Sequence, residues 1–350
     1  MHRPPAGVIL TVGLLLVACT PQPTARPDGS APSAAPSPAA TPPATSTPSV
    51  RPSPAMEPTL DPAAVARRID AAAIERHLAA LWQATRAHDG HRGSGSAGYE
   101  AAQTYATSVL EAAGYEVERL PFGRDGVSGT NLIVERPGAG ETGEVVMLGA
   151  HLDSVPGSPG MNDDGSGVAA VVAVAEAIGA LPPPHHTIRL ALWDAEEHGP
   201  FGSAAYVDAL RPAERARIRA YLNLDMIGSP NGLRLVYAEA DAAPGSDAIS
   251  DALAGVLDDA GLAWERIDLD GDSDHGPFVA AGIPTGGLFS GGIEPVTDAQ
   301  SRRFGAVAGV PADACSHRPC DTIDNVDPAL AAELARSAAI VLVELASAGR

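Results

Sequence analysis

A histidine and several carboxylates follow an apolar run near the middle of the chain. The apolar residues 145–150 lead into His151 and Asp153, and a Gly/Ser/Pro loop then leads to Asp163 and Asp164 before an Ala/Val-rich segment. Imidazole and carboxylate groups at the end of a buried strand are costly to bury unless they are paired, and a divalent metal ion is a suitable partner. Taken alone, the stretch is also compatible with a solvated loop and ordinary helix caps.

Further polar residues of the same kind follow later apolar runs. Glu196 and Glu197 come after the run 190–193, Asp225 stands late in another run, and His317 lies in a loop near the C-terminus. A pair of adjacent acids is usually a solvated turn. Behind a buried strand, one acid can instead hold a metal ion while the other acts as a general base on water.

The elements that must position these residues alternate between strands and helices. Strands are predicted at 115–122, 130–135, 145–150, 187–193, 220–226, 233–237 and 283–289, and helices at 62–88, 96–113, 167–180, 202–210, 246–260 and 328–348. This order is typical of a three-layer α/β sandwich with a mixed, mostly parallel central sheet and helices on both faces. Ligands bind outside the carboxyl ends of strands in such sheets, so we treat the polar residues as one site.

The N-terminal part of the chain has the features of an export signal. An apolar stretch, 8–18, is too short to span a bilayer comfortably and ends in Leu-Val-Ala-Cys, which resembles a bacterial lipoprotein box with Cys19 as the lipidated residue. An ordinary signal peptide is the alternative. We therefore predict a signal peptide at 1–18, a Pro/Ala/Ser/Thr-rich tether at 19–60 that cannot bury enough surface to fold, and a catalytic domain at 61–350.

Charge and cysteine content narrow the possible partners. The formal net charge is −20, from 43 acidic and 23 basic residues, so nucleic acid and anionic lipid are excluded as favourable partners. Cys315 and Cys320 lie close together, and in an exported chain this spacing indicates a small disulfide loop around His317. A zinc knuckle is the alternative, but a second cysteine pair is missing.

Taken together, these blocks resemble the secreted dinuclear zinc aminopeptidases, a family that includes the Streptomyces-type and bacterial leucine aminopeptidases. The resemblance runs from about residue 63 to the end of the chain. The matching blocks are 151–155, 162–167, 195–197, 223–229 and 315–327, with 273–275 and 286–289 also in agreement. Five blocks in the right order are far more specific than any single motif.

The resemblance implies two zinc ions per chain, bridged by Asp163. His151 and Asp225 would complete the ligands of one ion, and Glu197 and His317 those of the other. Each ion would then have one imidazole and carboxylate oxygens, which suits zinc with an open position for water.

The resemblance also implies the catalytic roles. Glu196 would be the general base that activates water and then protonates the leaving amine. Asp153 would orient the imidazole of His151. We expect Met226 and Phe289 to line the pocket for the first side chain of the substrate, with Ser316 beside them.

The sequence departs from the family at the substrate site. Ser316 stands where Streptomyces-type relatives have a tyrosine that donates to the developing oxyanion, and a serine is shorter. Asp272 stands near Ser273 where relatives carry an arginine, which implies different recognition of the substrate. Relatives have a cis peptide bond after the bridging aspartate, so the same is expected between Asp163 and Asp164.

We therefore expect an exported, lipid-anchored zinc metallopeptidase that acts on peptide N-termini, favours apolar first residues and is monomeric. One rival is a glutaminyl cyclase-like acyltransferase, which shares the fold but uses one zinc ion. A second is a related carboxypeptidase or dipeptidase, which would cleave substrates with a blocked N-terminus. A third is an inactive binding module, but such proteins lose ligands or the base, and both are present here.

Overall fold

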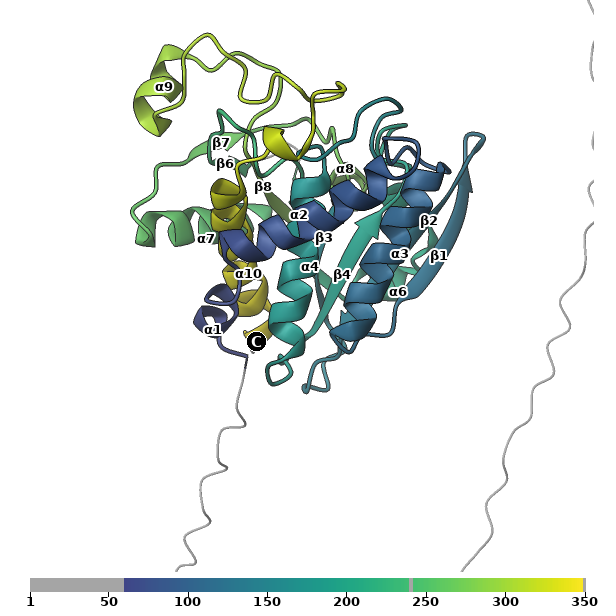
Figure 1. Cartoon of the computed structure of the whole chain (residues 1–350). Coiled ribbons are helices and arrows are strands. Elements are labelled where there is room, and N and C mark those ends of the chain that lie inside the picture. The colour runs from purple at the N-terminus through teal and green to yellow at the C-terminus, as the bar shows by residue number, and fades with distance from the viewer. Residues whose placement is uncertain (1–59, 239–241, 349–350) are drawn as a thin grey trace, which may run out of the picture. The chain divides into compact units, whose positions relative to one another are not determined.

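An eight-stranded mixed sheet forms the centre of the computed structural model, which describes residues 60–238 and 242–348 (Figure 1). The strand order is β1-β2-β4-β3-β5-β8-β6-β7. The strands are β1 (Glu118–Arg124), β2 (Val127–Arg136), β3 (Val145–His151), β4 (Thr187–Trp193), β5 (Ile218–Leu224), β6 (Leu235–Tyr237), β7 (Glu265–Ile267) and β8 (Thr285–Phe289). The central strands β4, β3, β5 and β8 pair in parallel, whereas β1–β2, β2–β4 and β6–β8 are antiparallel. The predicted mixed α/β fold is confirmed.

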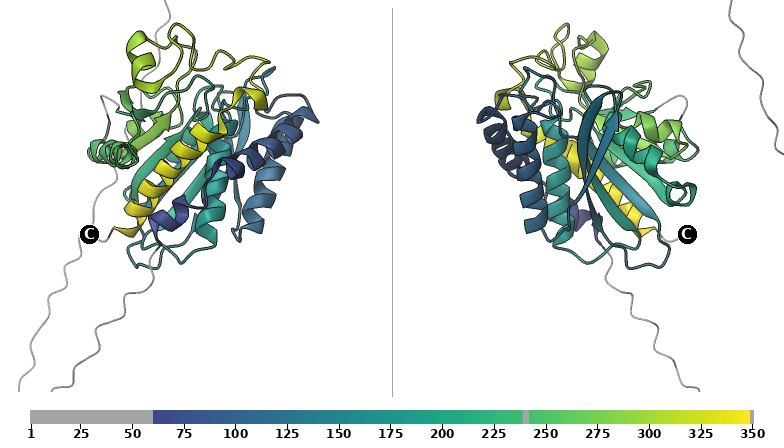
Figure 2. Two further views of the ribbon diagram at one scale, coloured as in Figure 1. Left: turned by 60° about the vertical axis from the view of Figure 1, so that its left-hand side comes forward. Right: turned by 90° about the vertical axis from the view of Figure 1, so that its right-hand side faces the viewer.

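Helices cover both faces of this sheet (Figure 2). They are α1 (Pro62–Ala66), α2 (Ala71–Arg86), α3 (Ala97–Ala112), α4 (Gly165–Gly179), α5 (Phe201–Ala209), α6 (Pro212–Arg215), α7 (Ser246–Asp259), α8 (Gly276–Ala280), α9 (Asp298–Phe304), the 3-10 helix η1 (Ile323–Asn325) and α10 (Pro328–Ser347). Side chains alternate across β3, so Val146 and Leu148 belong to the apolar cluster that includes side chains of α1, α2, α3, α4, α7 and α10, while Val145 and Met147 belong to the cluster that includes side chains of α5 and α8. This produces the three layers.

The strand β3 and the helix α4 form the buried centre that positions the site. Every residue of β3 is buried, and almost all of α4 is buried as well. A strand covered on both faces must be apolar along its whole length, which explains the uninterrupted run before His151. The polar residues therefore begin only where β3 reaches the edge of the sheet.

The predicted first helix is instead two helices, α1 and α2. Asp70 interrupts the helical periodicity because its carboxylate accepts a hydrogen bond from the backbone N–H of Ala73 at 2.8 Å and caps α2. The elements β7, α6, α8, α9 and η1 were not expected, because runs of three to seven residues are too short to show a period.

The predicted signal peptide, the tether and Cys19 lie outside the described residues, apart from Leu60. Leu60 is 1% exposed and belongs to the main apolar cluster. Over residues 60–238 and 242–348, no helix has the length and apolar character needed to cross a bilayer.

Candidate metal centre and active site

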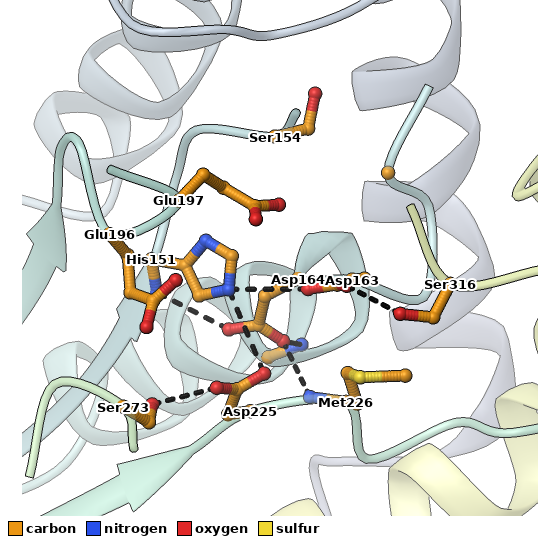
Figure 3. Close-up of polar contacts among 12 residues, drawn as sticks. His151, Ser154, Asp163, Asp164, Glu196, Glu197, Asp225, Met226, Ser273 and Ser316 are labelled. Carbon is orange, nitrogen blue, oxygen red and sulfur yellow. Dashed lines mark hydrogen bonds and ion pairs between the residues drawn. The ribbon is translucent and has the colours of Figure 1, made fainter. Parts of the chain in front are cut away.

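The predicted ligands come together in two groups that share Asp163: His151, Asp163 and Asp225 form one group, and Asp163, Glu197 and His317 form the other. Within each group the possible ligand atoms lie within 4.8 Å of one another. Oδ1 of Asp163 lies 3.4 Å from Nε2 of His151, whereas Oδ2 lies 3.2 Å from Nε2 of His317. The two oxygens of one carboxylate thus face two different imidazoles. Figure 3 shows Asp163 between His151 and Ser316.

Parallel strand ends place most of these residues at one edge of the sheet. His151 is the last residue of β3, the Glu196–Glu197 pair follows β4, and Asp225 directly follows β5. His151 pairs in register with Trp193 at the end of β4, so the polar residues that follow emerge side by side. The other two predicted ligands, Asp163 and His317, come from loops, one before α4 and one before η1.

The donor set fits two divalent cations. The side chains of Asp163 and Glu197 are 7% and 6% exposed, and within the described part of the chain only His151 and His317 offer them a cation within ion-pair distance. Burial alone would lower the pKa of His151, but its carboxylate neighbours raise it well above its usual value. Hydrogen bonds with Asp163 and Glu197 raise the pKa of His317 to about 11. Bound metal would supply the positive charge that these protons otherwise supply, and one imidazole with carboxylates suits zinc.

Asp153 lies behind the first group and is fully buried. Its Oδ1 lies 3.5 Å from Nδ1 of His151, which leaves Nε2 directed at Asp163 and Asp225. The same carboxylate accepts hydrogen bonds from the backbone N–H groups of Glu196 at 3.1 Å and Glu197 at 3.2 Å. One side chain therefore links the imidazole to both glutamates.

A hydrogen-bonded chain fixes Asp225 from the opposite side. Ser273 donates to Oδ2 of Asp225 at 2.7 Å and accepts from Nδ2 of Asn223 at 2.9 Å. Tyr221 donates to Asn223 at 2.6 Å, and Trp193 donates to Tyr221 at 2.8 Å. This series of hydrogen bonds thus connects Asp225, a metal-ligand candidate, to the aromatic core on one face of the sheet.

Asp164 is a structural residue of the site whose contacts were not predicted. Its buried carboxylate accepts from the backbone N–H groups of His151 at 3.2 Å, Gly167 at 2.9 Å and Met226 at 3.0 Å. It therefore ties together the ends of β3 and β5 and the start of α4. The peptide bond between Asp163 and Asp164 is cis, which confirms the expectation. The sequence indicated only a helix cap at this position.

Arg92 is a second supporting residue of the site that the sequence did not predict. The side chain is fully buried and donates to the carbonyl oxygens of Leu152 at 2.9 Å and Gly160 at 2.8 Å, and to that of Pro159. These contacts hold the loop that joins His151 to Asp163. No apolar period or motif marks Arg92, since it lies in a loop between two helices.

The disulfide between Cys315 and Cys320 is confirmed, and it closes the loop that carries His317. The carboxylate of Asp321, the next residue, accepts from the backbone N–H groups of Asn162 at 2.9 Å and Asp163 at 3.1 Å. Ser316 donates to Oδ2 of Asp163 at 3.0 Å. The disulfide loop is thereby fastened to the loop that carries the shared carboxylate.

We predict that Cys315→Ser/Cys320→Ser chains lose zinc selectively from the Glu197–His317 group. Without the crosslink, His317 is held only through Asp321 and its neighbours, so metal affinity there should fall about 10- to 100-fold, as when other supports of a ligand are removed. Zinc titration should show one affinity unchanged and one weakened. Equal weakening of both affinities would contradict the prediction.

A cavity of about 620 Å³ opens above the two groups. Its lining includes Glu196, which belongs to neither group, and burial raises the pKa of this carboxyl well above its usual value. The three residues expected to form the substrate pocket all line it: Met226, Phe289 and Ser316. Left-handed backbone conformations occur at Ala195, Met226 and His317, beside or within the site, where such strain is commonly found.

The fold and the paired carboxylate–histidine groups define an α/β protein with two adjacent groups of metal-type ligands at the strand ends. Residues 131–342 match the model of peptidase family M28, and the chain belongs to this family. It is 40% identical over 274 residues to leupeptin-inactivating enzyme 1 of Streptomyces exfoliatus, which covers 76% of this chain and 61% of that protein. It is 39% identical over 206 residues to the probable lipoprotein aminopeptidase LpqL of Mycobacterium tuberculosis, covering 56% of this chain and 41% of the relative. The chain thus spans about half of the length of these relatives.

Solved structures share the fold. The aminopeptidase from Aneurinibacillus sp. strain AM-1 gives a TM-score of 0.66 at 18% identity, covering 83% of this chain and 97% of that one. Porphyromonas gingivalis glutaminyl cyclase gives 0.62 at 19% identity, covering 79% and 99%. The zinc aminopeptidase BSAP from Bacillus subtilis gives 0.53 at 25% identity, covering 63% and 51%. The first two, at under 20% identity, show similarity of fold alone.

Proposed function

We propose that this protein is a zinc-dependent aminopeptidase that releases the first residue of peptides. The observation that carries the proposal is the pair of metal-type groups sharing Asp163, with Glu196 beside them in one cavity. Membership of a peptidase family and relatives named aminopeptidases support the same reaction. Zinc fits the donor atoms, and the structural relative from Bacillus subtilis is a zinc aminopeptidase.

Two zinc ions held by these groups would supply Lewis acidity toward the scissile carbonyl and would acidify water near neutral pH. Glu196 takes the proton from the attacking water and returns it to the nitrogen of the leaving amine. Asp153 orients His151 and fixes the backbone that carries Glu196. Ser316, which donates to Asp163, supports the shared carboxylate.

The finer features of the proposal concern specificity and location. Met226 and Phe289 provide apolar surface in the cavity for the first side chain of the substrate. The Cys19 motif and the name of the lipoprotein relative support an exported chain anchored by lipid through the 19–60 tether. The catalytic domain would then act outside the cytoplasm as a monomer on peptide N-termini.

Glutaminyl cyclase activity is less well supported than aminopeptidase activity, although the glutaminyl cyclase of Porphyromonas gingivalis shares the fold. That chemistry requires one zinc ion, whereas this chain brings together two complete groups around a shared aspartate. A metal content near one per chain, with cyclisation of an N-terminal glutamine, would favour the cyclase instead.

The direct test compares leucine p-nitroanilide with its N-acetyl derivative, using protein stripped of metal and protein reloaded with zinc. We expect hydrolysis of the free amine only, loss of activity on stripping, and recovery at two zinc ions per chain. Cleavage of neither compound by protein holding two zinc ions would overturn the aminopeptidase. Cleavage of blocked peptides alone would favour a carboxypeptidase or dipeptidase.

A further inference from the structure

One carboxylate in the active-site cavity has no role in the proposed reaction. Three of the lining acids belong to the metal-type groups and Glu196 is the proposed base, but Asp272 also lines the cavity. Asp272 is exposed, and its carboxylate has no hydrogen-bond or ion-pair partner among residues 60–238 and 242–348. A negative charge facing the substrate space without a protein partner can be matched by a cation on the substrate.

Backbone and side-chain hydrogen bonds place Asp272 on the Asp225 side of the cavity. Its backbone N–H donates to the carbonyl of Leu269 at 2.9 Å, and the carbonyl of the next residue, Ser273, accepts from Gly276 at 2.9 Å. The hydroxyl of Ser273 donates to Asp225. The peptide segment that carries Asp272 is therefore fixed beside the Asp225 ligand.

A second charged side chain of the cavity without a proposed role, that of Arg318, lies beside the metal-type group that contains His317. Arg318 lines the cavity and directly follows His317 in the disulfide loop. The carbonyl of Arg318 accepts from Ser158 at 2.9 Å, which holds this residue on its own side. Asp272 thus lies on the Asp225 side of the cavity and Arg318 on the His317 side.

Apolar surface lies in the same cavity as Asp272. Met226 follows Asp225, and Phe289 ends β8, the strand adjacent to β5. A pocket with apolar walls and a carboxylate at its rim matches a side chain that has an aliphatic stem and a charged end. Lysine and arginine have this form. The exposure of Asp272 favours the end of a long side chain over the α-amine, which must lie near the buried reacting groups.

We infer that Asp272 is a specificity-determining residue through which the enzyme accepts peptides whose first residue is lysine or arginine, in addition to apolar first residues. The inference rests on the proposed aminopeptidase function. The aliphatic stem lies against Met226 and Phe289, and the cationic end reaches Asp272.

The test compares the p-nitroanilides of lysine and norleucine, whose side chains share a four-carbon stem and differ by the ammonium group. The ratio of kcat/KM for lysine to that for norleucine should fall about fivefold in Asp272→Asn, the size of one partly exposed ion pair. It should fall about 20-fold in Asp272→Lys, where attraction becomes repulsion. Raising the salt concentration should lower the ratio in the wild-type enzyme.

Asp270→Asn is the matched control. Asp270 is exposed in the same loop but lines a different cavity, so its loss removes the same charge without touching the active site, and the ratio should stay at the wild-type value. A ratio unchanged in both Asp272 variants, or lowered equally by Asp270→Asn, would overturn the inference while leaving the aminopeptidase intact. Equal losses on both substrates would assign Asp272 to the α-amine and overturn it as well. Failure of zinc-loaded wild-type protein to cleave either substrate would instead overturn the function on which it rests.

Discussion

Replacing Glu196 with glutamine should lower kcat for leucine p-nitroanilide by at least about 10²-fold, because an amide cannot take the proton from the attacking water. Both zinc ions should remain bound, since Glu196 belongs to neither metal-type group. The backbone at Glu196 is held through its N–H by Asp153, so the loop does not depend on the replaced carboxylate. The measurement is kcat together with zinc content.

Glu197→Gln is the matched control because the same chemical change is made one residue away. Oε2 of Glu197 lies 3.0 Å from Nε2 of His317, within the second group. The Glu197→Gln variant should lose zinc. Its activity should fall as a consequence and recover in part when zinc is added. A Glu196→Gln enzyme with kcat within about threefold of wild type would show that another group acts as the base.

Asp163→Ala should abolish binding at both metal positions and reduce activity by at least about 10³-fold, because Lewis-acid stabilisation contributes several kcal/mol and about 1.4 kcal/mol corresponds to tenfold in rate. The shared position of Asp163 explains the double loss, as its two oxygens face different imidazoles. Zinc per chain, measured after dialysis against buffered free zinc, should approach zero.

His317→Ala separates the two positions. This residue belongs only to the second group, so the variant should retain about one zinc ion per chain, bound through His151 and its partners. If Asp163→Ala also retained one tightly bound ion, the carboxylate would not be shared, and two independent sites would replace the bridged centre.

Three of the five ligand candidates, His151, Glu197 and Asp225, stand at or just after the ends of apolar runs, which is the signal that the sequence offers for them. His151 ends β3 and Asp225 follows β5, and because these strands pair in parallel their ends meet, so the structure places both residues in one group. The residues that support the ligands were harder to find. Arg92 and Asp321 act through backbone carbonyl and N–H groups of distant loops, and a charged residue in a loop gives no sign in the sequence that it will be buried.

Local patterns also failed where a single side chain decided the backbone. Asp70 divides a periodic segment into α1 and α2 by capping the second helix, which apolar spacing does not reveal. Ser316 was expected beside the substrate pocket, with a side chain shorter than the tyrosine of relatives. The structure adds that its hydroxyl donates a hydrogen bond to the shared Asp163. Such contacts depend on tertiary placement and not on spacing in the chain.

The fastening of Ser316 to Asp163 joins residues that are 153 positions apart. An unfolded chain does not hold these residues together, so metal at this centre would bind only the native state and add to its stability, by about 4 kcal/mol at a thousandfold excess over the dissociation constant. The same ions that serve catalysis would then also limit transient opening of the domain. The local supply of zinc would then set the lifetime of the folded domain as well as its turnover.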